Sequence, residues 1–146
     1  MKITRAAEYA IRCMVYLVRK GKGTLVSRRE IAHQAEIPAQ FLAKIAQELA
    51  RAGFIEIRQG AKGGFVLINE PKEMNLLEIV ETIIGEISLN ESSALLDFCS
   101  DPNQCPVHSV WTDATSQLRD TLQGVTFDKI SKKGSCISIE KPKSDK

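Results

Sequence analysis

Two cysteines and a histidine are the residues of this sequence best suited to chemistry. Five residues separate Cys99 from Cys105, and two more separate Cys105 from His108. Pro102 lies between the cysteines, which indicates an irregular loop. Two thiolates beside an imidazole in such a loop can bind a soft metal ion or an iron–sulfur cluster. A redox-active dithiol and two unrelated cysteines remain as alternatives, because a Cys-x5-Cys spacing is not diagnostic.

The surroundings of the cysteines indicate which ones are reactive. Cys105 directly precedes a helix predicted to start at Pro106, and the positive end of a helix dipole favours a thiolate. Cys13 falls on the inward side of a predicted helix and is interpreted as a buried hydrophobic residue, whereas Cys136 lies in a loose tail. Four cysteines are too few for a disulfide scaffold. His33 is interpreted as a partly exposed structural histidine.

Length and composition exclude several classes of protein. The chain has 146 residues, of which 43% are hydrophobic and 26% are charged, enough for one domain with an appendage. No apolar run approaches the ~20 residues of a membrane span, and the charged residues Glu8 and Arg12 argue against a signal peptide. We therefore expect a location in the bacterial cytoplasm. The sequence lacks Walker, GxGxxG, nucleophile-elbow and HExxH motifs, so we expect no enzyme.

The elements before residue 54 predict a helix-turn-helix. An apolar stripe of helical period predicts a first helix over residues 4–20. Ser27 and Glu30 have the spacing of a capping box, which predicts a second helix through Ala35. Pro38 suits the first position of a third helix, and Gly53 suits its left-handed C-terminal end. Two helices joined by so tight a turn are typical of the helix-turn-helix.

A predicted hairpin follows these helices and completes a winged-helix pattern. Residues 54–58 and 65–68 are short β-type segments, and the loop of residues 59–64 is rich in glycine. Such a thin loop can approach a phosphate backbone or a minor groove. With the outward face of the third helix, it supplies the predicted contacts to double-stranded DNA: Arg28, Arg29, Ala39, Gln40, Ala43, Lys44, Arg58, Gln59, Lys62 and Gly63.

The charge distribution agrees with an anionic partner for this half of the chain. Residues 1–70 carry 12 Lys and Arg against 6 Asp and Glu, whereas residues 71–146 carry 8 against 12. The net charges of the two parts are therefore +6 and −4, although the whole chain carries only +2. A basic segment of this kind is typical of nucleic-acid binding, although a net charge of this size also occurs through ordinary variation among proteins.

The C-terminal half predicts a dimerisation element. A capped helix is expected near residues 75–85, and a long helix runs from Pro106 to Gly124. One face of the long helix carries a seam too extended for so small a domain to cover. Such a seam favours a homodimer, which would match a palindromic operator, over a helix that packs along its own domain. The seam consists of Val107, Val110, Trp111, Ala114, Leu118 and Leu122. The tail from Ser131 shows no core pattern. Three parts are thus expected: 1–70, 71–130 and 131–146.

These segments together resemble the IscR/NsrR/CymR family of bacterial winged-helix transcription regulators. The resemblance rests on MKITRAAEYAIRCMVYL at the start, on the stretch from SRREIA to GGFVL with Arg58-Gln59-Gly60 and Gly63-Gly64-Phe65, and on CPVHSVW before the long helix. It implies a mainly α-helical fold with a small β-hairpin, namely a winged helix-turn-helix followed by a long dimerisation helix.

The resemblance also implies how such a regulator senses its signal. Many members bind a [2Fe-2S] or [4Fe-4S] cluster through three cysteines and a fourth ligand. Cys99, Cys105 and His108 match this pattern, but Ser93 stands at the place of the first cysteine. An acidic ligand from the partner's first helix would correspond to Glu8. The expected function is a dimeric repressor sensing iron–sulfur, redox or nitric oxide status through a [2Fe-2S] cluster, with a cluster-free regulator controlled by a partner protein or thiol oxidation as the alternative.

Overall fold

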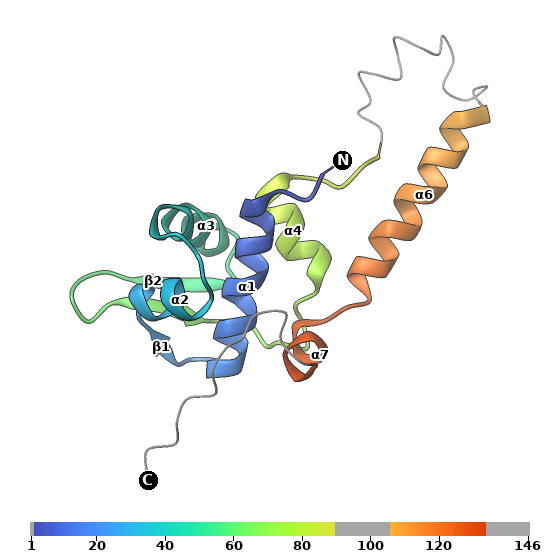
Figure 1. Ribbon diagram of the computed structural model, residues 1–146. Helices are drawn as coiled ribbons and strands as arrows, with labels where there is room; N and C mark the ends of the chain where they lie inside the picture. The colour runs from blue at the N-terminus through green and yellow to red at the C-terminus, as the bar shows by residue number, and fades with distance from the viewer. Residues whose placement is uncertain (1, 90–105, 134–146) are drawn as a thin grey trace.

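The computed structural model describes residues 2–89 and 106–133, and these form a helical body with one projecting helix (Figure 1). In chain order the elements are α1 (Arg5–Lys20), β1 (Leu25–Val26), α2 (Arg28–Gln34), α3 (Ala39–Arg51), β2 (Ile55–Arg58), β3 (Gly64–Leu67), α4 (Leu76–Ile84), α6 (Pro106–Gln123) and α7 (Phe127–Lys132). The fold is therefore mainly helical, as the sequence predicted. No described helix is both long and apolar enough to cross a membrane.

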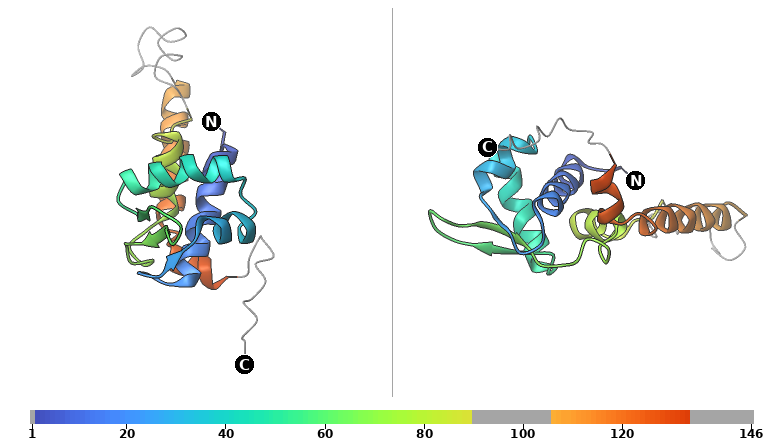
Figure 2. Two further views of the ribbon diagram at one scale, coloured as in Figure 1. Left: turned by 90° about the vertical axis from the view of Figure 1, so that its left-hand side faces the viewer. Right: turned by 90° about the horizontal axis from the view of Figure 1, so that it is seen from below.

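Helix α1 is the central element of the body. Its N-cap Thr4 accepts a hydrogen bond from the backbone N–H of Ala7 at 3.2 Å. Its apolar stripe packs against α3, α4 and α7, which surround it (Figures 1 and 2). Cys13 is fully buried in this core, which confirms the interpretation of that residue as a hydrophobic one. Burial raises the pKa of its thiol to about 12, so Cys13 is protonated at neutral pH.

Only half of the capping box predicted for α2 forms. The side chain of Ser27 accepts from the backbone N–H of Glu30 at 3.2 Å, as expected. The Glu30 carboxylate, however, binds the hydroxyl of Tyr16 and the ammonium of Lys20, both at 2.7 Å. The prediction that Glu30 reaches back to the helix start is therefore wrong, because two partners on α1 lie within its reach.

The turn between α2 and α3 is tight and strained at one residue. Glu36 has a φ of 53°, a left-handed conformation that non-glycine residues rarely adopt. The N–H of Ile37 donates to the carbonyl of Ala32 at 2.9 Å and closes the turn. Pro38 is the N-cap of α3 rather than its first helical residue, so the helix begins one residue later than predicted, at Ala39. Gly53 has a φ of +87° after α3, which confirms the expected left-handed end.

The sheet has three antiparallel strands in the order β1-β3-β2, so the predicted two-stranded hairpin was incomplete. The missed strand, β1, pairs Leu25 with Val66 and Val26 with Phe65. It also explains one glycine, because a Cβ on Gly64 would lie 2.1 Å from the carbonyl oxygen of Val26. The close approach of β1 and β3 thus requires glycine at position 64, whether or not DNA is present.

The C-terminal helices join the body through a corner between α6 and α7. Asn75, the N-cap of α4, forms a complete capping box with Glu78, at the place where a capped helix was predicted. The N–H of Phe127 then donates to the carbonyl of Met74 at 3.0 Å, and its side chain is fully buried in the main core. Helix α7 continues to Lys132, past Ser131, where the sequence had indicated the start of a tail.

Candidate nucleic-acid interface

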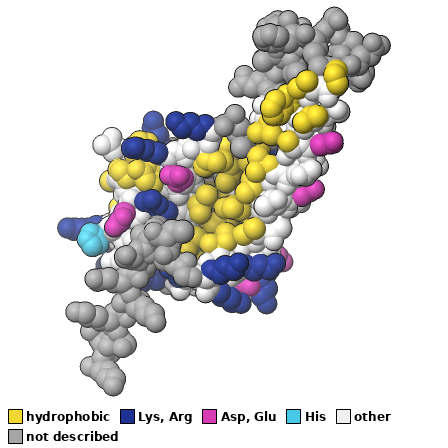
Figure 3. Space-filling model, turned by 45° about the vertical axis from the view of Figure 1, so that its right-hand side comes forward, with side chains coloured by type: hydrophobic (Ala, Val, Ile, Leu, Met, Phe, Trp, Pro, Cys, Tyr) yellow, Lys and Arg dark blue, Asp and Glu magenta, His cyan; other side chains and the backbone are white. Residues whose placement is uncertain are grey.

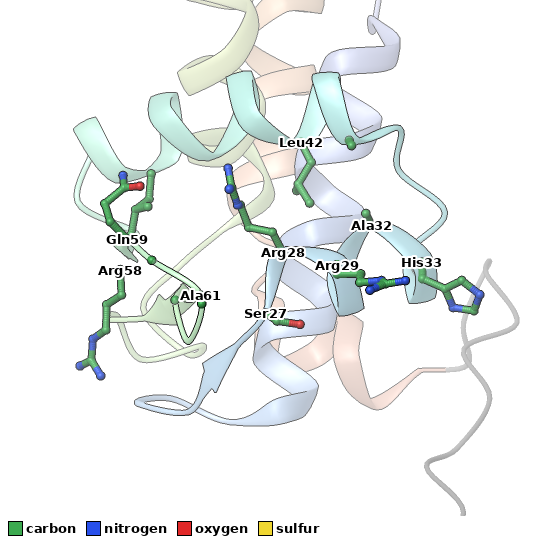
Figure 4. A pocket seen from close by; sticks show the side chains of 13 residues that line it. Ser27, Arg28, Arg29, Ala32, His33, Leu42, Arg58, Gln59 and Ala61 are labelled. Carbon is green, nitrogen blue, oxygen red and sulfur yellow. The ribbon is translucent and has the colours of Figure 1, made fainter.

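A hollow of about 720 Å³ lies between α2, α3 and the wing, which is the loop of residues 59–63 together with the ends of β2 and β3 (Figure 4). It forms because the helix-turn-helix and the hairpin share one side of the core. Six of the ten predicted DNA contacts line it: Arg28, Arg29, Ala39, Arg58, Gln59 and Gly63. Tertiary structure therefore brings together residues that are up to 35 positions apart in the sequence.

The cationic side chains around the hollow do not all point into it. Arg28 extends toward α3, whereas Arg29 and His33 point outward along α2 (Figure 4). Arg58 points away from the hollow, and its Nε donates to Glu56 at 3.2 Å. In the described part of the chain no ion pair forms at Arg28 or Arg29, so these guanidinium groups are available to an external anion.

The remaining four predicted contacts lie outside the hollow. Gln40 and Lys44 are exposed one turn apart on α3, and Ala43 beside them is half-buried. Lys62 is exposed at the tip of the wing. Neither Lys44 nor Lys62 has an ion-pair partner among the described residues. The exposed face of α3 and the wing therefore flank the hollow and present both hydrogen-bonding groups and cations to solvent, an arrangement that suits base edges and phosphates.

Sequence reasoning missed an aromatic group at the start of α3. Phe41 is 43% exposed, and its ring lies 5.4 Å from that of Tyr9 on α1. The guanidinium of Arg12 covers the Tyr9 ring at 5.7 Å and donates to the carbonyl of Glu36 at 3.5 Å. These contacts tie the turn and the first residues of α3 to α1. The helical position of Phe41, at the edge of the apolar stripe, was the available signal.

The contacts of Glu30 with Tyr16 and Lys20 attach α2 to α1, as the Phe41 and Arg12 contacts attach α3 to α1. Burial opposes ionisation of Glu30, but its hydrogen bonds with Lys20 and Tyr16 outweigh that effect and lower the pKa of the carboxyl below its usual value. For Tyr16, burial and the hydrogen bond to Glu30 raise the pKa of the phenol. Glu30 is thus ionised at neutral pH and holds the start of α2, where Arg28 and Arg29 are located.

The candidate sensing residues are only partly described by the structure. Cys99, Cys105 and Ser93 lie outside the described residues. Glu8 is exposed on the first turn of α1, and His108 lies on the first turn of α6. The Nδ1 atom of His108 is buried and has no hydrogen-bond partner among the described residues. A shielded imidazole nitrogen without such a partner has the position that a metal-ligating nitrogen requires. The described residues contain no group of three or more His, Cys, Asp or Glu that could bind a metal ion.

The predicted seam on α6 divides into two parts. Val107, Val110 and Trp111 are 50%, 59% and 43% exposed. Leu118 and Leu122, by contrast, pack against a small apolar cluster of the same chain that includes Val80 and Ile87. Figure 3 shows hydrophobic side chains continuing from the body along α6. The outer part of the seam is thus uncovered, while the inner part already has intrachain contacts.

A helix-turn-helix together with a three-stranded sheet that carries a wing is the winged-helix arrangement, which is typical of DNA-binding transcription regulators. The chain belongs to the Rrf2 family, whose model, described as an iron-dependent transcriptional regulator, matches residues 3–133. The resemblance to the IscR, NsrR and CymR regulators is confirmed by this match together with relatives and solved structures that carry those names.

Known proteins similar to this chain agree with that assignment. A candidate HTH-type transcriptional regulator of Aquifex aeolicus is 33% identical over 130 residues, covering 87% of this chain and 89% of the relative. NsrR of Bacillus licheniformis is 28% identical over 89% of this chain and 92% of its own length. The relatives are transcriptional regulators rather than enzymes, as the sequence indicated.

Solved structures show the same fold. CymR of B. subtilis, described as the global cysteine regulator, superposes with a TM-score of 0.75 at 24% identity, covering 90% of this chain and 96% of that one. The structure of a candidate transcriptional regulator from Listeria innocua superposes with a TM-score of 0.76 at 26% identity, covering 97% of this chain and 93% of that one.

Proposed function

We propose that this protein is a homodimeric, sequence-specific repressor that binds a palindromic operator. The observation that carries the proposal is the hollow between α2, α3 and the wing, where Arg28, Arg29 and Gln59 lie beside the exposed face of α3. Each subunit places α3 in a major groove, and the wing contacts the adjacent phosphates or minor groove. Two-fold symmetry of the dimer then matches the two half-sites.

Each candidate side chain has a role that follows from its chemistry. Gln40 offers an amide that can pair with an adenine edge, and Lys44 can reach a guanine or a phosphate. Arg28 and Arg29 contact the backbone from the start of α2. Lys62 carries positive charge at the tip of the wing. Arg58 contacts a phosphate only after its pairing with Glu56 is exchanged, so we expect a smaller contribution from it.

The uncovered part of the α6 seam supports a homodimer. Three large apolar side chains, Val107, Val110 and Trp111, are exposed on successive turns of a projecting helix. A second copy of α6 packed along this face would remove them from water. Leu118 and Leu122 already pack on side chains of α4, so only the surface that these contacts leave uncovered can join the interface.

Cys99 and Cys105, with His108 and Glu8 of the partner, are the proposed ligands of an iron–sulfur cluster of the [2Fe-2S] type. The buried Nδ1 of His108, which no described residue contacts through a hydrogen bond, supports its assignment as a ligand. When bound, the cluster supplies sensitivity to oxidants, nitric oxide and iron supply. The chain's own contribution is to connect the ligands to α6 and, through Glu8, to α1 of the reading head, that is, the DNA-binding part of one subunit (residues 1–70). Occupancy of the cluster site is thereby coupled to operator affinity.

A cluster-free regulator controlled by thiol oxidation or a partner protein is the second candidate. Ser93 stands where the family pattern has its first cysteine, which favours this alternative. A structure similar to this chain, at 25% identity and a TM-score of 0.68, is described as the oxidized form of Staphylococcus aureus CymR.

The salt dependence of binding to an operator selected from random duplexes tests the DNA-binding proposal. If the dimer neutralises about six phosphates, log affinity should fall with log salt at a slope of about −5. Fluorescence anisotropy with the labelled duplex measures this slope. An affinity independent of salt would contradict the proposed interface.

Anaerobic reconstitution distinguishes the two sensing candidates. Wild-type protein should bind iron and sulfide and show sulfide-to-iron absorption, which Cys99→Ser and Cys105→Ser should each lose, with a parallel change in operator affinity. Glu8→Ala should weaken cluster retention and leave the dimer intact. Cys136→Ser is the matched control and should behave as wild type. Equal iron content in all variants would favour the cluster-free candidate.

A further inference from the structure

A polar clamp centred on Glu81 joins three parts of the chain at the base of α6. One oxygen of the Glu81 carboxylate accepts from Nη1 of Arg119 on α6. The same oxygen accepts from the backbone N–H of Ile87 at 2.9 Å. Nη1 of Arg119 also donates to the carbonyl of Ile87 at 3.4 Å, which closes a ring of contacts among α4, residue 87 and α6.

A second contact repeats the same connection one helical turn away. The backbone N–H of Leu89 donates to the hydroxyl of Thr115 on α6 at 3.2 Å. Thr115 and Arg119 are four residues apart and therefore lie on one face of the helix. The segment of residues 87–89 is consequently held between α4 and α6 by three hydrogen bonds, one to Glu81 of α4 and two to side chains of α6.

The clamp is located where the support of α6 ends. Beside the clamp and toward the C-terminal end of α6, Leu118 and Leu122 pack on the apolar cluster that includes Val80 and Ile87. Above the clamp, Val107, Val110 and Trp111 are exposed, and Figure 1 shows that half of the helix standing away from α1 and α4. Apolar contacts are non-directional, whereas a carboxylate–guanidinium pair has a defined geometry. The direction of α6 relative to α4 thus depends strongly on Glu81 and Arg119.

We propose that Glu81 is a positioning residue for operator recognition: through Arg119 it fixes the direction of α6, and thereby the half-site spacing that the dimer accepts. This inference rests on the proposed dimeric DNA-binding function. Because Glu81 also holds Ile87, a displacement of residues 87–89, which lead along the sequence toward Cys99, changes the direction of α6 through the same carboxylate. Neither Glu81 nor Arg119 touches DNA in this account.

Spacing is a sensitive readout of the angle between two reading heads. One added base pair separates two half-sites by about 3.4 Å and rotates them by about 35°. A dimer in which the direction of α6 is fixed should bind one spacing best. A dimer in which that direction varies should accept neighbouring spacings as well, while each reading head keeps its contacts within a half-site.

The experiment compares affinities for the selected operator and for duplexes with one base pair added to or removed from the spacer. Wild type should prefer its own spacing by about tenfold or more, a difference that corresponds to a rigid dimer. Glu81→Gln keeps the size of the side chain but removes its charge, and should reduce the preference to below about threefold. Affinity for a single half-site and the sedimentation coefficient should not change. Glu86→Gln, an exposed neighbouring glutamate, is the matched control and should retain the wild-type preference.

Variants at Arg119 keep the proposal falsifiable if Glu81→Gln is unstable. Arg119→Gln should relax spacing to the same degree, Arg119→Lys should retain most of the preference, and the double variant should be no worse than either single variant. An unchanged spacing preference in folded, dimeric Glu81→Gln and Arg119→Gln would overturn the inference alone. A monomeric wild type, or one without operator affinity, would instead overturn the proposed function.

Discussion

Phe127 should be among the largest single contributors to stability in this protein, although no long apolar pattern surrounds it in the sequence. Its side chain is fully buried in the main core, which also contains Met74 and the inward residues of α1, and its N–H donates to the carbonyl of Met74 at 3.0 Å. Phe127→Ala keeps that backbone hydrogen bond but removes the ring and leaves a cavity. Substitutions of this kind cost about 3–5 kcal/mol, from the missing transfer free energy and incomplete collapse of the cavity.

Urea denaturation measures this destabilisation directly. With a slope of about 2 kcal/mol per molar urea for a domain of this size, a decrease of about 4 kcal/mol lowers the midpoint by about 2 M. Phe41→Ala removes the same ring from a position that is 43% exposed, and should cost about 1 kcal/mol, mostly through its contact with Tyr9. All variants must be compared at one protein concentration, since the proposed dimer would add a concentration-dependent contribution to the apparent stability. Equal midpoints for the two phenylalanine variants would refute the assignment of Phe127 to the core.

Three further predictions concern the dimer, the DNA interface and the effect of pH. Val110→Asp, at a position 59% exposed in the single chain, should yield folded monomers in sedimentation. The new carboxylate is hydrated in the monomer but would be buried without a partner in the dimer interface. A persistent dimer would place the interface elsewhere. Lys62→Ala should weaken binding to all duplexes and flatten the salt slope by about 1 for each phosphate that is no longer neutralised, whereas Gln40→Ala should change sequence preference in a duplex-selection assay. Because the folded pKa of Glu30 is lowered, its ionisation stabilises the protein above the ordinary glutamate pKa, and this contribution disappears as pH falls through the folded value. Tyr16→Phe should reduce that effect in acid-denaturation curves, and an unchanged curve would contradict the role of the hydrogen bond.

The helices could be predicted from the sequence because their apolar periods are long. Helices α1, α3, α4 and α6 each extend over at least nine residues, with caps or glycines at their ends. Strand β1 has only two residues, Leu25 and Val26, and no period can be read from so short a segment. Its pairing with β3 depends on tertiary contacts, and so does the requirement for glycine at position 64.

The candidate site was predictable in its residues more than in its geometry. The cations of α2, α3 and the wing follow from the helix-turn-helix pattern. That Arg28 points toward α3 while Arg58 pairs with Glu56 depends on side-chain neighbours, which the sequence does not order in space. The same limitation applies to Glu30, whose spacing from Ser27 fits a capping box but whose carboxylate finds closer partners on α1.

Different contacts attach α6 to the body and set its direction. At its C-terminal end the chain turns back into the body, where the N–H of Leu76 donates to the carbonyl of Val125 at 2.9 Å and Phe127 enters the core. Disruption of this corner should reduce global stability, because its residues belong to the main core. The Glu81–Arg119 pair is partly exposed, and its removal should cost little stability. It acts near the point where α6 leaves the body, however, so a small change of angle there becomes a larger displacement at Val107. Stability and operator geometry should therefore respond to different substitutions in the same helix.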